Sequence, residues 1–378
     1  MSERASSSFL RAVLVEWPLF AIPVALSLLG ILTMHPFGDG NSLAPKQLLW
    51  LAIALIAYFT CAVLDMRFIR RTNVIVIGYG VLVGVLVLLL VAADPVSGAR
   101  SWFTFGGFSL QPADLGKILF IALIAKYFSR RHMEIGDFRH IIVSGIYAAV
   151  PIILILLEPD LGTAAIFVAI WFGTVLVSGI SKKHLLLVIV AGLVTLAGLW
   201  FGGLHEYQRA RIMTFVNPAA DIHGSGYNAY QATVAAGSGQ LFGKGIGYGT
   251  QSKLRFLPEY ETDFIFAAFA EEWGFIGVML ILLLYAILLA RLVGIARRSA
   301  TNFDAFFTIG VIIMITSHVF IHAGINLGLL PVTGTTIPFM SYGGSHLLME
   351  FVALGIVTSL AGEGRSVPRQ AANQEYFG

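Results

Sequence analysis

The stretch NVIVIGYGVLVGVLVLLLVA, residues 73–92, holds no charged side chain over 20 consecutive positions. A helix rises about 1.5 Å per residue, so this run matches the hydrocarbon thickness of a bilayer, about 30 Å. The rest of the chain has a similar character, because 57% of its 378 residues are hydrophobic and only 12% are charged. A soluble domain carries about 25% charged residues. Composition therefore predicts an integral membrane protein.

A hydropathy scan with a window of about 19 residues predicts ten membrane-spanning helices. We therefore expect one all-α domain over residues 1–378, a polytopic bundle of ten transmembrane helices. The fourth span has the weakest apolar signal, because it carries Asp114, Lys117 and Lys126. The expected spans are 17–35, 47–65, 73–92, 113–128, 140–157, 161–179, 184–202, 263–290, 303–325 and 345–361.

The basic residues predict the orientation of this bundle. With the amino end in the cytoplasm, 16 of the 24 Lys and Arg side chains fall on inner segments, 7 fall on outer segments, and Lys117 lies within the membrane. This excess follows the positive-inside rule, so we expect a multi-pass protein of the cytoplasmic (inner) membrane with both termini in the cytoplasm. The expected extracytoplasmic loops are 93–112, 326–344 and the largest, 203–262 between spans seven and eight; the tail 363–378 is expected to be disordered.

Several familiar sites are not supported by the sequence. Cys61 is the only cysteine, so no intrachain disulfide and no cysteine-based metal site is expected. The glycine-rich stretch GQLFGKGIGYGT satisfies neither the Walker nor the dinucleotide-binding spacing and predicts a turn cluster, with no nucleotide site. His318 and His322 lack a third ligand and are interpreted as helix–helix contacts. The small net charge of +3 does not indicate nucleic acid.

The eighth expected span opens with three carboxylates that hydrocarbon should reject. Asp263 is expected in its first turn with Thr262 as the cap, either as a capping residue or as a base held at the membrane surface. Glu271 and Glu272 lie about 12–13 Å further along a helix. An unpaired charge there costs at least roughly 2.5 kcal/mol, so at least one of the two must meet a cation, a water-filled cavity or its own proton. Lys117 is the expected cation.

Other polar residues lie near the outer ends of the spans. Asp114 and Lys117 are three residues apart and share a helix face. Trp102 fits either the aromatic belt of the membrane or a stacking surface for a sugar ring. Glu158, in the sequence EPD, fits either a tight turn or a site, and Arg211 fits either an interface cation or a phosphate ligand.

Five motifs occur together in the chain: QPADLGK, EPDLGTA, YQRARIMTF, GSGQLFGKGIGYGTQSKLRFLPEYETDFIFAAFAEEWGFIG and PVTGTTIPFMSYGGSHLL. In this order, and with ten spans, they resemble the SEDS family of cell-wall glycosyltransferases. The last motif is more similar to RodA, the rod-shape elongation member, than to FtsW, the division member. Three positions depart from the family pattern: Asp114 replaces a glutamate, Glu261 stands where a histidine is frequent, and His346 replaces a serine.

The resemblance implies a peptidoglycan glycosyltransferase that polymerises lipid II at the outer face of the membrane, by inverting displacement of undecaprenyl pyrophosphate. It implies that Asp263 is the catalytic residue, and that Trp102, Lys117 and Arg211 belong to the site. The full set of candidate substrate-binding residues is Trp102, Arg100, Lys117, Asp114, Glu158, Arg211, Lys253, Glu259 and Ser341.

A pyrophosphate leaving group needs positive charge, which Arg211, Lys117, Arg100 or a divalent cation could supply. The expected cofactor is such a cation, Mg²⁺ or Mn²⁺. The chain contains no transpeptidase-like domain, so crosslinking is expected to come from another protein. The family resemblance implies that this partner is a class B penicillin-binding protein, together with other proteins of the elongation complex. Two alternatives remain at this level. Intramembrane charges also fit a lipid II flippase, and a non-catalytic scaffold of the cell-wall synthase would need no activity at all.

Overall fold

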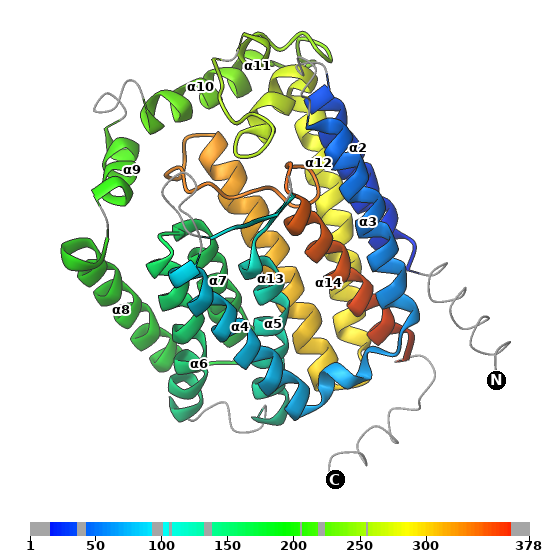
Figure 1. Ribbon diagram of the computed structural model, residues 1–378, viewed down its shortest axis with the longest axis vertical. Helices are drawn as coiled ribbons and strands as arrows, with labels where there is room; N and C mark the ends of the chain where they lie inside the picture. Colours follow the sequence, from blue (N-terminus) through cyan, green and yellow to red (C-terminus); the bar gives the residue numbers. More distant parts are fainter. Residues whose placement is uncertain are drawn as a thin grey trace, which may run out of the picture.

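The computed structural model describes residues 16–35, 43–92, 101–105, 108–131, 138–204, 206–217, 224–254 and 256–363. Arg100 and the tail beyond residue 363 lie outside these ranges. Ten of the described helices coincide with the ten expected spans (Figure 1). They are α2 (Pro18–Met34), α3 (Ala44–Val63), α4 (Thr72–Ala92), α5 (Pro112–Arg131), α6 (Phe138–Leu157), α7 (Leu161–Val177), α8 (Lys182–Gly198), α12 (Ile265–Arg298), α13 (Asn302–Asn326) and α14 (Gly344–Glu363).

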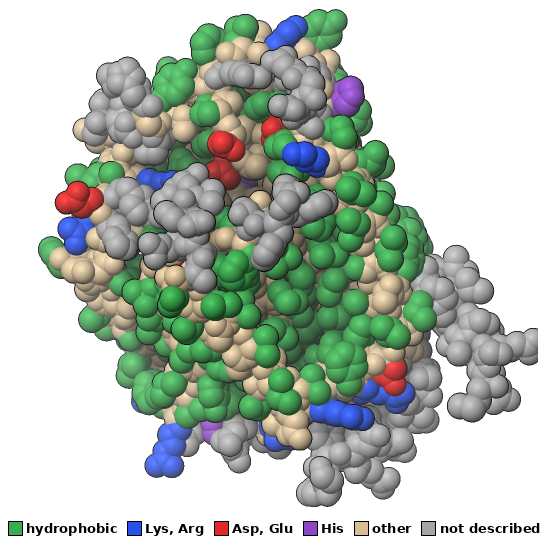
Figure 2. All heavy atoms as spheres, in the orientation of Figure 1, with side chains coloured by type: hydrophobic (Ala, Val, Ile, Leu, Met, Phe, Trp, Pro, Cys, Tyr) green, Lys and Arg blue, Asp and Glu red, His purple; other side chains and the backbone are tan. Residues whose placement is uncertain are grey.

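The helices form the apolar body of a multi-span membrane protein. Within the described residues, seven helices are long and apolar enough to cross a bilayer, and α2 and α7 are apolar but have only 17 residues each. The remaining one, α5, is interrupted by the charges of its first turns. Figure 2 shows the corresponding belt of hydrophobic side chains, with charged side chains gathered toward the two ends. The number of ten spans stays a prediction.

The core of the bundle is built around α13 and α14. Helix α13 packs against α5, α7 and α12, whereas α14 packs against α3 (Figure 1). The α14–α3 contact is close because a Cβ at Gly355 would lie 2.6 Å from the carbonyl oxygen of Tyr58. Small residues allow such approaches between membrane helices. The Tyr58 hydroxyl also lies 3.0 Å from Oγ1 of Thr358, which satisfies both polar groups inside the bundle.

Helix α12 is broken near its start, which the sequence did not predict. Gly274 has φ 66° and ψ −168°, so the helix before it and the long helix after it are separate segments. The amide of Lys244 donates to the carbonyl of Glu271 at 2.9 Å, and the amide of Phe275 donates to the carbonyl of Gln240 at 2.8 Å. The glycine-rich turns therefore satisfy the backbone groups that the break leaves open.

Between α8 and α12 the chain forms α9 (Glu206–Val216), α10 (Ser225–Ser238) and α11 (Thr250–Lys253). Figure 1 places α10 and α11 across one end of the bundle. Another connection at this end is the hairpin of β1 (Phe103–Phe105) and β2 (Phe108–Leu110), in which Thr104 pairs with Ser109. Polar motifs from distant parts of the sequence are thus gathered at one end of the bundle.

Candidate active site at one end of the bundle

Asp263 lies in the turn before α12, and not in its first helical turn as the sequence predicted. The amides of Thr262, Asp263 and Phe264 donate to the carbonyl of Glu259, at 3.2, 3.1 and 3.2 Å. Phe264 occupies the N-cap position. The Thr262 hydroxyl lies 3.2 Å from the Glu259 carboxylate, so Thr262 does not cap the helix. The local turn pulls Asp263 out of the helix and presents it at the end of the bundle.

Two polar side chains hold the backbone around this aspartate. Asn326, at the end of α13, donates to the carbonyl of Asp263 at 3.0 Å and accepts from the amide of Ala267 at 3.0 Å. The Ser341 hydroxyl donates to the carbonyl of Thr262 at 2.8 Å. Ser341, predicted to bind substrate, is thus occupied with backbone. The sequence did not single out Asn326, although an amide ending an apolar helix was a usable signal.

Asp263 sits in an electrostatic environment that disfavours its ionised form. Burial raises the pKa of its carboxyl to about 7, with further contributions from the carboxylates of Glu259 and Asp160, while the Arg211 guanidinium acts in the opposite direction. A Cβ at Gly334 would lie 3.6 Å from Oδ2 of Asp263. Glycine at this position, with φ 74°, therefore keeps one side of the carboxylate open.

The turn between α6 and α7 supplies two more carboxylates. Asp160 caps α7 by accepting from the amide of Thr163 at 2.9 Å, and it also accepts from the side chain of Gln111 at 2.9 Å. Glu158 is fully buried, and neither of its carboxylate oxygens has a hydrogen-bond partner among the described residues. Burial, reinforced by Asp160, raises the pKa of Glu158 to about 8. Glu158 is therefore largely protonated at neutral pH.

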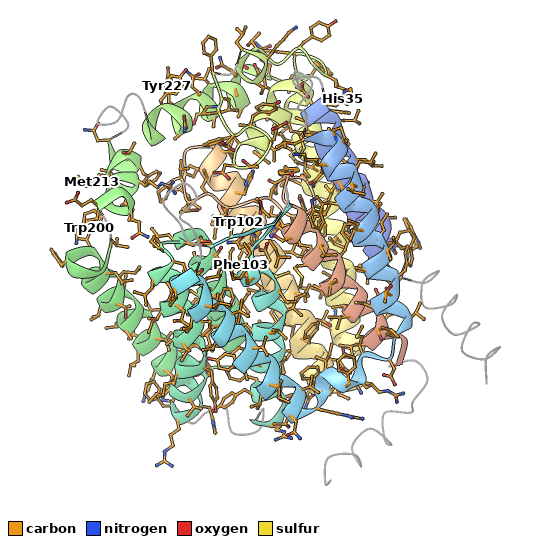
Figure 3. The ribbon with its side chains drawn as sticks, viewed as in Figure 1. His35, Trp102, Phe103, Trp200, Met213 and Tyr227 are labelled. Carbon is orange, nitrogen blue, oxygen red and sulfur yellow. The ribbon has the colours of Figure 1, made fainter. Side chains whose placement is uncertain are left out.

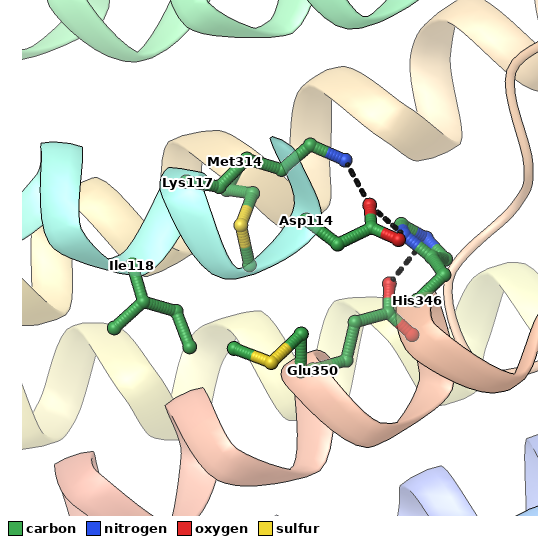
Figure 4. Close-up of a pocket in the computed structure, with 7 residues that line it drawn as sticks. Asp114, Lys117, Ile118, Met314, His346 and Glu350 are labelled. Carbon is green, nitrogen blue, oxygen red and sulfur yellow. Dashed lines mark hydrogen bonds and ion pairs between the residues drawn. The ribbon is translucent and has the colours of Figure 1, made fainter. Parts of the chain in front are cut away.

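Lys117 and Asp114 form an ion pair inside the bundle (Figure 4). Nζ of Lys117 lies 2.9 Å from Oδ1 of Asp114, and the side chains are only 4% and 2% exposed. The predicted shared helix face is confirmed. The Ser345 hydroxyl donates to Oδ2 of Asp114 at 2.9 Å, and His346 Nδ1 lies 3.3 Å from Oδ1. Asp114, shorter than the glutamate of the family pattern, is thus met by two side chains of α14.

The expectation that Lys117 pairs with Glu271 or Glu272 is wrong. Glu271 is fully buried and accepts from Nζ of Lys244 at 2.7 Å and from the amide of Thr250 at 2.9 Å. Glu272 accepts from the amide of Gly247 at 2.8 Å. Because α12 breaks after these residues, both carboxylates meet the glycine-rich turns instead of α5. They anchor that segment.

The other predicted residues are distributed around this end. Trp102 is partly buried at the start of β1, near the centre of the view in Figure 3. Arg211 lies on α9 and lines a cavity of about 220 Å³ between α9, α10 and residues 327–332. Glu259 is exposed beside Asp263. Lys253 is exposed at the end of α11, and its side chain forms no ion pair with another described residue.

Comparison with known families identifies the chain. It matches the family of cell cycle proteins that comprises FtsW, RodA and SpoVE over residues 7–366. The chain belongs to this family. Among relatives of the FtsW/RodA/SpoVE family, stage V sporulation protein E of Bacillus subtilis is 37% identical over 86% of this chain and 89% of its own length. Peptidoglycan glycosyltransferase MrdB of Escherichia coli K12 is 36% identical over 72% of this chain and 75% of its own length.

A probable FtsW of Pseudoalteromonas translucida is 31% identical over 89% of this chain and 84% of its own length, so more than one branch of the FtsW/RodA/SpoVE family is represented. Solved structures agree in fold. RodA of Thermus thermophilus superposes with a TM-score of 0.69 at 30% identity, covering 91% of this chain and 96% of the other. A chain from a peptidoglycan synthase complex that coordinates polymerization and crosslinking gives a TM-score of 0.78 at 29% identity, over 93% and 98%.

Whether this chain could bind a metal ion depends on how its carboxylates and histidines are arranged. Over the described residues, no three His, Cys, Asp or Glu side chains converge as a ligand set. His318 and His322 instead use Nδ1 to contact the carbonyls of Thr336 and Thr335, at 3.2 and 2.7 Å. Mg²⁺, however, commonly binds one or two carboxylates and completes its shell with substrate phosphates and water. The carboxylates of Asp263 and Glu259, which influence each other at the turn before α12, fit this mode of binding.

Proposed function

We propose that the chain is a peptidoglycan glycosyltransferase that polymerises lipid II at the outer face of the cytoplasmic membrane during cell elongation. Family membership and the names of the MrdB and FtsW relatives support the activity. The last sequence motif supports the elongation role. The observation that carries the proposal is Asp263, a carboxylate with a pKa near 7 at the polar end of an apolar bundle.

Asp263 is proposed as the general base. The acceptor sugar hydroxyl loses its proton as it attacks the anomeric carbon of a lipid-linked donor, and a positioned carboxylate takes that proton. A base works best when its pKa lies near the operating pH, which the value of about 7 satisfies. Attack from the face opposite the leaving group inverts the anomeric carbon, so the proposed reaction needs no covalent intermediate.

The leaving pyrophosphate requires positive charge and not a protein acid. The Arg211 guanidinium lowers the pKa of Asp263, and the Lys117 ammonium lowers the pKa of Asp160, which supports both cations as candidates for this charge. A divalent cation at Asp263 and Glu259 would supply further charge to the phosphates. The positions of the sugars are expected nearer Trp102, whose ring offers an apolar face.

Both lipid tails stay in the bilayer throughout this reaction, which explains a site at the junction of helices and connecting segments. The termini are proposed to be cytoplasmic, so the end that carries Asp263 faces outward. Crosslinking is assigned to a class B penicillin-binding protein, with other elongation proteins completing the assembly. The fold similarity to a chain of a peptidoglycan synthase complex supports a partner of this kind.

Purified chain, with and without the transpeptidase, should polymerise lipid II in detergent, and Asp263→Asn should reduce turnover by about 10²–10⁴-fold. Asp65→Asn is the matched control, because this aspartate lies next to the 3-10 helix Met66–Arg70 and pairs with Arg67 at 2.7 Å. We expect wild-type rates for the control, and thermal stability no lower than that of wild type for Asp263→Asn, because burial disfavours the ionised carboxylate. Retained turnover in Asp263→Asn would remove it from the role of base.

The same assay separates the alternatives. A flippase forms no polymer in detergent, where no second membrane face exists, and a scaffold forms none with any partner. Repeating the assay in EDTA, followed by Mg²⁺ or Mn²⁺, tests the cofactor proposal. If turnover is unaffected by chelation, the divalent cation is excluded while the base remains tested by Asp263→Asn.

A further inference from the structure

A buried charge network lies below the proposed site, between α5 and α14 (Figure 4). It consists of Asp114, Lys117, His346 and Glu350. Nδ1 of His346 lies 3.3 Å from Oδ1 of Asp114, and Nε2 lies 2.9 Å from Oε1 of Glu350. All four side chains are at most 9% exposed. The imidazole therefore bridges a carboxylate of α5 and a carboxylate of its own helix.

The contacts of both ring nitrogens indicate that His346 is charged. A neutral imidazole has one donor and one acceptor nitrogen, and an acceptor nitrogen would repel a carboxylate oxygen. Nδ1 lies 3.3 Å and Nε2 lies 2.9 Å from a carboxylate oxygen, so these surroundings favour the charged imidazolium, although the Nε2 contact has ion-pair distance without hydrogen-bond geometry. The other titratable neighbour, His318, packs with its ring centroid 4.7 Å from that of His346. His318 turns its own Nδ1 toward the carbonyl of Thr336, so it does not replace either carboxylate.

Glu350 connects this network to the turn that holds Asp263. Its second oxygen accepts from the amide of Phe339 at 2.8 Å, and Phe339 has φ 64°, a conformation that needs support from its surroundings. Two residues later, the Ser341 hydroxyl donates to the carbonyl of Thr262, the residue before Asp263. A continuous set of contacts thus runs from His346 to the backbone of the proposed base.

On the other side, the network sets the charge environment of Lys117. Nζ of Lys117 has one described hydrogen bond, to Asp114, and so keeps two further hydrogens. The His346 imidazolium is a second cation beside Asp114. The charge of Asp114 is therefore shared between His346 and Lys117 and does not cancel that of Lys117 completely. A cavity of about 10 Å³ borders the network, enough for about one water molecule.

We propose that His346, as an imidazolium held between Asp114 and Glu350, is a positioning residue for glycosyl transfer. It leaves the Lys117 charge available to the anionic part of the substrate, and it supports the turn that fixes Asp263. This inference rests on the proposed function. It also accounts for two departures from the family pattern, since the shorter acid at position 114 and the longer base at position 346 contact each other.

Three variants test the pairing: His346→Gln, Glu350→Gln and the double variant. Each single variant leaves a buried charge without its partner, so we expect kcat for lipid II polymerisation to fall about tenfold with little change in KM. The double variant should lose less than the product of the two single effects, because it removes both charges together. His140→Gln is the control: His140 is also buried, but it contacts Tyr127, at 3.1 Å, at the start of α6.

The pH profile distinguishes positioning from simple structural support. In the wild-type protein, kcat should fall at acid pH as Asp263 takes up a proton. It should fall at alkaline pH as the His346 imidazolium loses one. Glu350→Gln removes one of the two carboxylates that favour the charged ring, so the alkaline limb should move to lower pH while the acid limb stays in place. Equal profiles in wild type and Glu350→Gln, or multiplicative losses in the double variant, would overturn the proposal.

Nitrogen-15 NMR of the histidine side chains, assigned through the loss of one signal in His346→Gln, tests the charge without any assay of activity. We expect two protonated ring nitrogens for His346 at pH 7. A neutral ring would overturn the proposal even if polymerisation is robust. Absence of polymer from the wild-type chain would instead overturn the proposed function, and the positioning role with it, while the NMR signal would still report the charge of the network.

Discussion

Two groups of carboxylates lie close in sequence or space and have opposite surroundings. Asp263 and Glu158, the rim carboxylates, are disfavoured in their ionised form by burial, and Glu158 has no described hydrogen-bond partner. Glu271, by contrast, accepts from a lysine, a hydroxyl and backbone amides. A saturated carboxylate fixes structure, whereas an under-satisfied one is free to take a proton or a ligand. The number of donors around an acid therefore separates the two roles.

The sharpest test of this contrast on stability is Glu271→Gln. Removing one member of a buried ion pair is strongly destabilising, but Lys244 is 30% exposed, which reduces the effect. We expect unfolding in detergent to become easier by about 2–3 kcal/mol. Turnover per folded molecule should stay within about twofold of wild type, in contrast to the loss expected for Asp263→Asn. A stable Glu271→Gln variant that has lost activity would reverse the assigned roles.

Glu158→Gln should stabilise the protein, in contrast to the destabilisation expected for Glu271→Gln. The pKa of Glu158 is raised from 4.5 to about 8 in the folded protein, which therefore favours the protonated carboxyl. The free energy of unfolding is highest below about pH 4.5 and falls as the pH rises toward 8. The glutamine variant avoids this loss and should be more stable than wild type by about 1–3 kcal/mol at pH 7–8. Thermal unfolding at pH 4, where the two proteins should coincide, is the internal control. Destabilisation at pH 8 would show that Glu158 has a donor in the folded protein.

A smaller effect is expected for Arg211→Gln. The Arg211 guanidinium lowers the pKa of Asp263, so its removal should move the acid limb of kcat/KM to higher pH. Activity below pH 7 should fall more than activity above it. Arg209→Gln, on the same helix, is the matched control and should leave the position of the limb unchanged. An unshifted limb in Arg211→Gln would mean that Arg211 acts on substrate alone.

The helices that coincide with the expected spans could be predicted from the sequence because each rests on a local property, a long apolar run. Pairing at short range was also readable, as the Asp114–Lys117 contact shows. The break at Gly274 could not be predicted from the sequence, because this glycine lies in an apolar run that has the pattern of one continuous helix. Its conformation depends on hydrogen bonds to residues 240–245, which no local pattern reports.

The candidate site was only partly readable for the same reason. Asp263 was singled out by a charge at the edge of an apolar run and by family resemblance. Asn326 and Asp160 act through contacts with segments far away in the chain, as in the bond from Asn326 to the carbonyl of Asp263. Lys117 was assigned to the wrong acid, since depth along a helix does not specify which neighbouring helix or loop is in contact.

The buried charge network has one consequence for an energised cell. A single charge that moves through the full membrane potential gains or loses about 2.3 kcal/mol per 100 mV. With the imidazolium proposed for His346, the side chains of Asp114, Lys117, His346 and Glu350 sum to no charge, so the voltage across the membrane exerts no net force on them. Any dependence of glycan synthesis on the membrane potential should therefore come from charges outside this network.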